Sequence, residues 1–117
     1  MSISSTRVTT FCDYAYSVSV SATTNPTLKN QDGTDYTKGE VALVQLHING
    51  TGTPDTDQFY IIGYNGSGTN EIRAVDTRSP AVSNRPELYL DSNGIPSLRT
   101  GHQNNYTVRV HVIKSIG

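Results

Sequence analysis

The clearest pattern in the chain is an alternation of apolar and polar residues over residues 7–22. One side of the alternation is mostly apolar, and the other side is rich in hydroxyl groups. The mostly apolar side comprises Val8, Thr10, Cys12, Tyr14, Tyr16, Val18, Val20 and Ala22. A period of two residues is typical of a β-strand, or of two strands joined at a bend. The apolar side must lie on a core or on a sister subunit, so the pattern predicts half-buried antiparallel sheet.

The rest of the chain divides into shorter strands separated by turn-forming residues. Residues 39–48 are largely apolar at both even and odd positions, interrupted by Gln45 and His47, which predicts a central strand buried on both faces over part of its length. Further strands are predicted at 58–64, 70–75, 87–90, 95–99 and 106–113, with a tight hairpin turn at 91–94. The polar stretches 23–38 and 76–86 are predicted as loops outside the core. This spacing predicts an all-β fold, an antiparallel β-sandwich of the jelly-roll kind with about seven to eight strands.

Composition supports one β domain over residues 1–117, because Val, Ile, Thr and Tyr are plentiful and a chain of 117 residues suits a single core. The net charge is −1 and no Lys/Arg run exists, which disfavours nucleic acid as a partner. No apolar run approaches the length of a membrane span, so we expect synthesis in the cytosol and no membrane insertion. Cys12 is the only cysteine, which excludes an intrachain disulfide. We expect a buried core thiol there, with a reactive or intersubunit role as the alternative.

No group of residues has the spacing of a catalytic or metal site. His47, His102 and His111 show no zinc-binding arrangement. Asp55 and Asp57 could form a glycosidase pair in principle, but on a Gly/Thr/Pro-rich loop they are more typical of solvated turn residues. The sequence therefore predicts a protein that is not an enzyme, with no catalytic residues, no cofactor and no metal.

The expected strand directions gather the loops at two ends of the sandwich. If consecutive strands run antiparallel, loops 23–38, 65–70 and 91–94 share one end, and loops 49–57, 77–86 and 100–105 share the other. The second end combines arginines with acids, and Arg suits the carboxylates of anionic polysaccharides. The candidate ligand-binding residues are therefore Arg78, Arg85, His102 and Asp57. The Asp- and Asn-rich first end is the alternative site, and turns contain these residues in any case.

The chain has seven tyrosines and no tryptophan. Tyr14 and Tyr16 share the apolar side of the first strand, and tyrosine suits both a wet subunit interface and stacking on a sugar ring. We expect a homotrimer whose interface uses the sheet face bearing Tyr14, Tyr16 and Val18.

Residues 87–101, ELYLDSNGIPSLRTG, followed by the predicted strand at 105–114, resemble the C-terminal jelly-roll domains of bacteriophage tail fibres and tailspikes. The resemblance implies a trimer of small sandwiches, related in shape to the tumour-necrosis-factor and C1q-like folds. It also implies a place on the virion, at the tip of a fibre, where the domain binds host-surface polysaccharide or assists trimerisation. These domains share an architecture rather than a fixed site, so no binding residue carries over.

The expected function is therefore a non-enzymatic receptor-binding, carbohydrate-binding and trimerisation domain of a phage tail fibre or spike. Two alternatives stay open. A free-standing bacterial lectin would use the same end loops without a virion, and a phage capsid decoration protein would use the sandwich to clamp neighbouring shell subunits.

Overall fold

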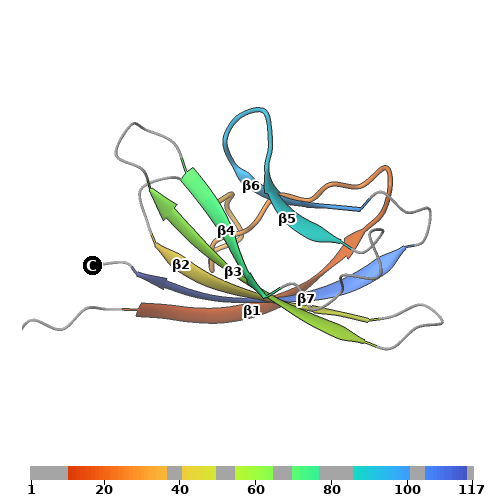
Figure 1. The fold of residues 1–117 in the computed structure, drawn as a ribbon, viewed down its shortest axis with the longest axis horizontal. Coiled ribbons are helices and arrows are strands. Elements are labelled where there is room, and N and C mark those ends of the chain that lie inside the picture. Colours follow the sequence, from red (N-terminus) through yellow and green to blue (C-terminus); the bar gives the residue numbers. More distant parts are fainter. Residues whose placement is uncertain are drawn as a thin grey trace, which may run out of the picture.

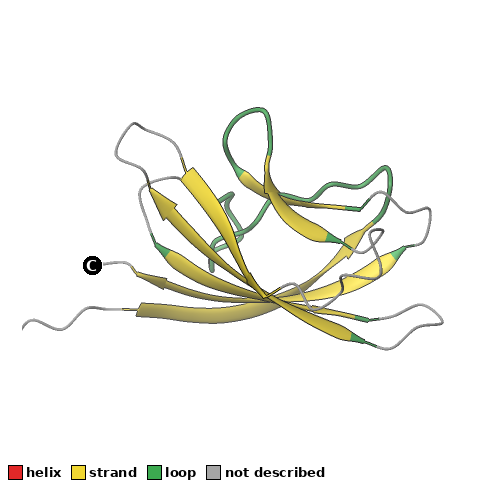
Figure 2. Cartoon of the chain, in the orientation of Figure 1, coloured by secondary structure: helices red, strands yellow, loops and turns green. Residues whose placement is uncertain are grey.

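The computed structural model describes residues 11–36, 41–49, 55–64, 70–76, 86–100 and 105–115. These residues form strands and loops without a helix (Figure 2). The strands are β1 (Phe11–Val20), β2 (Ala42–Ile48), β3 (Thr56–Tyr64), β4 (Asn70–Asp76), β5 (Glu87–Leu90), β6 (Pro96–Arg99) and β7 (Tyr106–Ser115) (Figure 1). They form two layers of antiparallel sheet, which confirms the predicted all-β sandwich.

The larger layer is a five-stranded sheet in the order β1-β7-β2-β3-β4. Every neighbouring pair in it is antiparallel, and β1 pairs with β7 along ten residues. The order places β2 in the middle, as its apolar composition predicts. Double burial of β2 is wrong, however, because Val44 and Leu46 are buried whereas Leu43 on the other face is 43% exposed. Among the described residues, the smaller layer covers only one face of the five-stranded sheet. One face of β2 is therefore buried and the other is partly exposed.

The smaller layer begins with the predicted hairpin of β5 and β6. Its turn is held by Asp91, whose Oδ1 accepts hydrogen bonds from the backbone amides of Asn93 and Ile95 at 2.8 and 3.0 Å. Gly94 completes the turn at a φ of 75°, in the left-handed region that glycine enters without strain. Local turn chemistry is thus enough to fix this element.

The segment 26–36 adds to the smaller layer, which corrects the prediction that residues 23–38 form an end loop outside the core. Leu28 donates its backbone N–H to Pro96 O at 2.8 Å, and Leu98 donates to Pro26 O at 2.9 Å, so the segment lies beside β6. Leu28 and Tyr36 are fully buried. Two apolar residues separated by seven mostly polar ones carry no recognisable period. Leu28 lies beside β6, and Tyr36 donates its backbone N–H to Leu28 O at 2.7 Å, so Tyr36 is placed by the fold-back of the segment onto itself.

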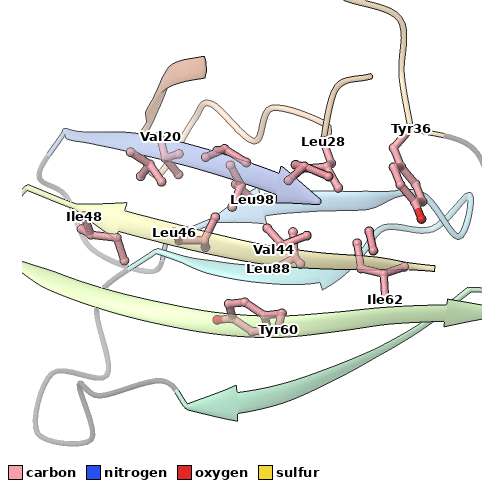
Figure 3. Close-up of a cluster of buried hydrophobic side chains, with 14 of the residues drawn as sticks. Val20, Leu28, Tyr36, Val44, Leu46, Ile48, Tyr60, Ile62, Leu88 and Leu98 are labelled. Carbon is pink, nitrogen blue, oxygen red and sulfur yellow. The ribbon is translucent and has the colours of Figure 1, made fainter. Parts of the chain in front are cut away.

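The core fills the space between the two layers (Figure 3). Val44, Leu46 and Ile62 from the large sheet lie opposite Leu88 and Leu98 from the small one, and all five are buried. Each buried aliphatic side chain contributes on the order of 2 kcal/mol. This shared core holds the two layers together.

The tyrosines of β1 also face this interior. Tyr14 Oη donates to Lys29 O at 2.6 Å, and the Lys29 amide donates to Tyr16 Oη at 2.9 Å. Both rings, together with Val18, pack against the core of their own chain. The segment 26–36 therefore covers part of the face on which we expected a trimer interface.

Candidate binding cleft

One end of the sandwich collects the connections that were predicted to carry the site. Ile48 pairs with both Thr56 and Val108, so β2 ends where β3 begins and close to the start of β7. β4 ends at the same side, since Asp76 pairs with Phe59 near the start of β3. This topology agrees with the predicted grouping of three connections at one end, namely those between β2 and β3, between β4 and β5, and between β6 and β7. Arg78, Arg85 and His102 themselves lie outside the described residues.

Asp57, the fourth predicted ligand-binding residue, is described and belongs to β3 rather than to a loop. Its Oδ1 lies 2.7 Å from His47 Nδ1, and Gln45 Nε2 donates to the same oxygen at 3.4 Å. Asp55 Oδ2 lies 3.4 Å from the other ring nitrogen of His47. The hydrogen bond to Asp57, and then the two negative charges, raise the pKa of His47. This cluster lies on the face of the sheet that points away from the core.

An open cleft of about 390 Å³ lies where the two layers separate, between β4 and β5. In the described part of the chain β4 pairs only with β3 and β5 only with β6, so each strand presents a free edge there. The lining residues are Tyr60, Ile72, Ala74, Glu87, Leu88, Tyr89 and Leu90. The cleft therefore combines aliphatic walls with two aromatic rings and a carboxylate.

Two lining residues of the cleft, Glu87 and Tyr89, contact Arg99 of the same hairpin, which is not itself part of the lining. Arg99 Nε donates to Glu87 Oε1 at 2.8 Å, as their direct pairing across β5 and β6 predicts. The Arg99 guanidinium lies 4.1 Å from the centroid of the Tyr89 ring, within cation–π range. The two contacts hold an aromatic ring, a carboxylate and a guanidinium close together before any ligand binds.

Tyr60 forms the back of the cleft. It is 3% exposed, and its hydroxyl donates to Gln58 Oε1 at 2.7 Å. Burial raises the pKa of Tyr60, although a hydrogen bond with the Leu88 backbone partly opposes this rise. The hydroxyl is therefore neutral at physiological pH and links β3 to β5 behind the open part of the cleft.

A second pocket, of about 300 Å³, lies near the opposite end of the sheet. Its residues include Lys114, whose Nζ donates to Asn30 Oδ1 at 2.5 Å and lies 4.7 Å from the centroid of the Tyr36 ring. Burial lowers the pKa of Lys114. Cys12 lines this pocket and is only partly buried, which corrects its expected place in the core. Its thiol donates to Gln31 Oε1 at 2.8 Å.

Sequence reasoning missed the cleft and the lysine for different reasons. Tyr60 lies on β3, whereas Glu87 and Tyr89 lie on β5, and no spacing along the chain shows that β5 lies beside β4. The burial of Lys114 could be predicted from the sequence, because Lys114 occupies the next alternate position after Val108, Val110 and Val112, whose side chains point inward. A charged residue at the next inward position could have indicated a buried amine.

Comparison with known proteins gives no family assignment, because no protein-family model, curated protein or solved structure matches the chain. Over the described ranges, no three or more His, Cys, Asp or Glu side chains are grouped in a way that could hold a metal ion. Nor does that part of the chain contain a helix with the length and apolarity to cross a membrane.

Proposed function

We propose that this protein is a non-enzymatic carbohydrate-binding module and that the cleft between β4 and β5 takes the sugar. The ligand is a host-surface polysaccharide, and the setting is the tip of a phage tail fibre or spike on the virion. The fibre setting rests on the resemblance of residues 87–114 to such domains. The cleft, with Glu87 and Tyr89 in its lining and both in contact with Arg99, is the observation that carries the binding function.

The chemistry of the cleft suits a sugar because a sugar ring presents both C–H faces and hydroxyl groups. The Tyr89 ring offers a surface for the C–H faces. The Glu87 carboxylate accepts hydrogen bonds from hydroxyls, and the Arg99 guanidinium donates to hydroxyls or to the carboxylates of an acidic sugar. Because these groups already contact one another, little side-chain freedom is lost when the ligand binds.

The predicted residues of the same end, Arg78 and Arg85, belong to the connection between β4 and β5, the two strands that border the cleft. Asp57 is removed from the proposed contact set, because it faces the outer side of the sheet with His47. The proposal therefore keeps the predicted end of the sandwich and moves the binding groups to Glu87, Tyr89 and Arg99.

A glycan array of bacterial surface polysaccharides, followed by calorimetry on the best ligand, tests the proposal. Tyr89→Ala and Glu87→Gln should each weaken binding about fivefold or more, because residues at the centre of a binding site cost more than about 1 kcal/mol when truncated. Glu71→Gln is the matched control, since Glu71 lies on β4 with its side chain half-exposed outside the cleft and should leave binding unchanged.

Two results would overturn the proposal. One is full binding by Tyr89→Ala while circular dichroism shows that the variant is folded. The other is a lack of affinity for every polysaccharide tested together with binding to phage capsids, which would favour a decoration protein. Retention of binding in a chelator is also expected, since the cleft residues need no metal to contact a sugar.

A further inference from the structure

The face of the large sheet that points away from the core carries apolar side chains that its own chain leaves exposed. We call it the outer face. Val41, Leu43, Ile61 and Val75 are 54, 43, 44 and 60% exposed, respectively. Val41 directly precedes β2, and the other three lie on β2, β3 and β4. An apolar patch of this kind on neighbouring strands is typical of a contact surface.

Strand register arranges the outer face in rows that run across all five strands. One row reads Asp13 on β1, Ile113 on β7, Leu43 on β2, Ile61 on β3 and Arg73 on β4. It has an acid at one end, three aliphatic residues in the middle and a base at the other end. The Asp13 and Arg73 side chains are 64 and 81% exposed. Asp13 also contacts His111 of its own chain.

This order is complementary to itself under a two-fold rotation. If the axis runs along β2 between two facing sheets, β1 of one copy lies over β4 of the other, and β7 lies over β3. Asp13 then faces Arg73 of the second copy, Ile113 faces Ile61, and Leu43 faces its own equivalent. A further row repeats the match, because Arg109 on β7 faces Asp57 on β3 of the second copy.

Sheet twist does not break these matches. Facing sheets cross at about 30°, which displaces strands two positions from the axis by about 5 Å. The long side chain of Arg73 can span such a displacement. Asp13 of each copy can therefore meet Arg73 of the other at both edges of the interface, where Arg73 also lies 3.8 Å from Glu71 of its own chain.

The size of the face fits a weak but specific contact. Five strands spaced about 4.8 Å apart and seven residues of about 3.3 Å each give a face of about 550 Å² per copy. Two copies would bury about 1,100 Å², just above the roughly 1,000 Å² that a specific interface needs. Obligate dimers bury more, so a dimer that dissociates on dilution is expected.

We propose that the outer face is a homodimer interface, in which two copies of this chain pack sheet against sheet about a two-fold axis parallel to β2. The contact is independent of the proposed sugar cleft, which lies between β4 and β5 on the other side of the large sheet. It uses none of the residues Tyr14, Tyr16 and Val18 on which the expected trimer depended. It also leaves the proposed sugar cleft of each copy open.

Sedimentation velocity over a wide concentration range tests the proposal. The wild type should shift from 12.7 kDa toward twice that mass as concentration rises. Leu43→Glu places carboxylates opposite each other in the centre of the interface and should keep the protein monomeric at every concentration. Ala22→Glu is the matched control, because it adds the same charge at an exposed turn residue outside the outer face and should dimerise as the wild type does.

Charge reversal tests the two-fold geometry itself. Asp13→Arg and Arg73→Asp should each raise the dissociation constant about tenfold, and the double variant should recover most of the wild-type affinity. A wild type that remains monomeric into the millimolar range would overturn the proposal. So would a trimer, or a dimer that survives Leu43→Glu. If neither charge variant changes the dissociation constant of the dimer, β1 of one copy does not lie over β4 of the other, and the proposed two-fold geometry is excluded.

Discussion

His47 lies between two carboxylates on the outer face and links the protonation of one side chain to the stability of the fold. Because its pKa is raised in the folded state, folding favours the protonated ring. The resulting stabilisation is fully present below the unfolded pKa of about 6.5 and is lost as pH rises through the folded pKa. The imidazole and both carboxylates are partly exposed, so the effect should stay below about 1 kcal/mol.

The prediction for His47 is that Asp57→Asn lowers its pKa, because it removes the hydrogen-bonded carboxylate that causes the largest part of the shift. NMR titration of the imidazole in the wild type and the variant measures this change directly. Urea unfolding at about pH 6 and about pH 8 should show a larger stability loss with pH in the wild type than in the variant. Asp32→Asn, at an exposed turn, is the control. An unchanged His47 pKa in Asp57→Asn would contradict the geometry.

Gly94 gives a second prediction at the scale of single residues. Its φ of 75° is costly for a residue with a Cβ, although no atom would contact an added Cβ within 4 Å. Gly94→Ala should therefore lower the free energy of unfolding by about 1–2 kcal/mol through backbone strain alone. Gly63→Ala is a matched control, because Gly63 lies within β3 with similar free space and no positive φ. Chemical denaturation measures both, and equal effects at the two positions would disprove the strain explanation.

At the scale of elements, the segment 26–36 is the part of the fold whose role most needs testing. It behaves as a strand beside β6 and places Leu28 between the layers at 0% exposure. Leu28→Ala should destabilise the protein by about 2–5 kcal/mol, the cost of a cavity in a rigid core. Thr24→Ala, at an exposed position of the turn before this segment, should stay within about 0.5 kcal/mol. A loss below about 1 kcal/mol for Leu28→Ala would show that the segment is not docked in solution.

The boundaries of the strands show which elements can be predicted from the local sequence pattern. The prediction for β5 matches its observed bounds, and β3, β4, β6 and β7 differ from the predicted ranges by one or two residues. These strands alternate clearly and are bounded by turn residues, so local chemistry decides them. The segment 26–36 lacks such alternation. Residues 26–28 pair with β6, and residues 34–36 fold back onto 28–30 of the same segment.

At the scale of the whole molecule, β1 and β7 pair along their full length although they lie at opposite ends of the chain. The sheet cannot form until these distant segments meet, and such pairing must first overcome a large loss of chain entropy. We predict refolding on the millisecond-to-second scale, measured by stopped-flow tyrosine fluorescence after dilution from urea. Relaxation within microseconds would contradict the dependence of the sheet on the pairing of β1 with β7.

The sequence by itself determined the parts of this protein that depend on neighbouring residues. A period of two fixes which side of each strand is apolar, and Asp91 with Gly94 fixes the hairpin turn. The alternation also places Tyr14 and Tyr16 on the same apolar side of β1, which must be buried. It does not determine whether a second subunit or the same chain buries that side.

Only the tertiary structure decided what covers each face. The segment 26–36 and the β5–β6 hairpin lie on one side of the large sheet, so Tyr14 and Tyr16 pack against the core and Leu43 is exposed. The same packing placed β5 beside β4 and brought Tyr60 and Tyr89 into one cleft. Alternation specifies two faces of a strand but not the partner of each, because that choice is made by the free energy of packing segments that are far apart in the chain.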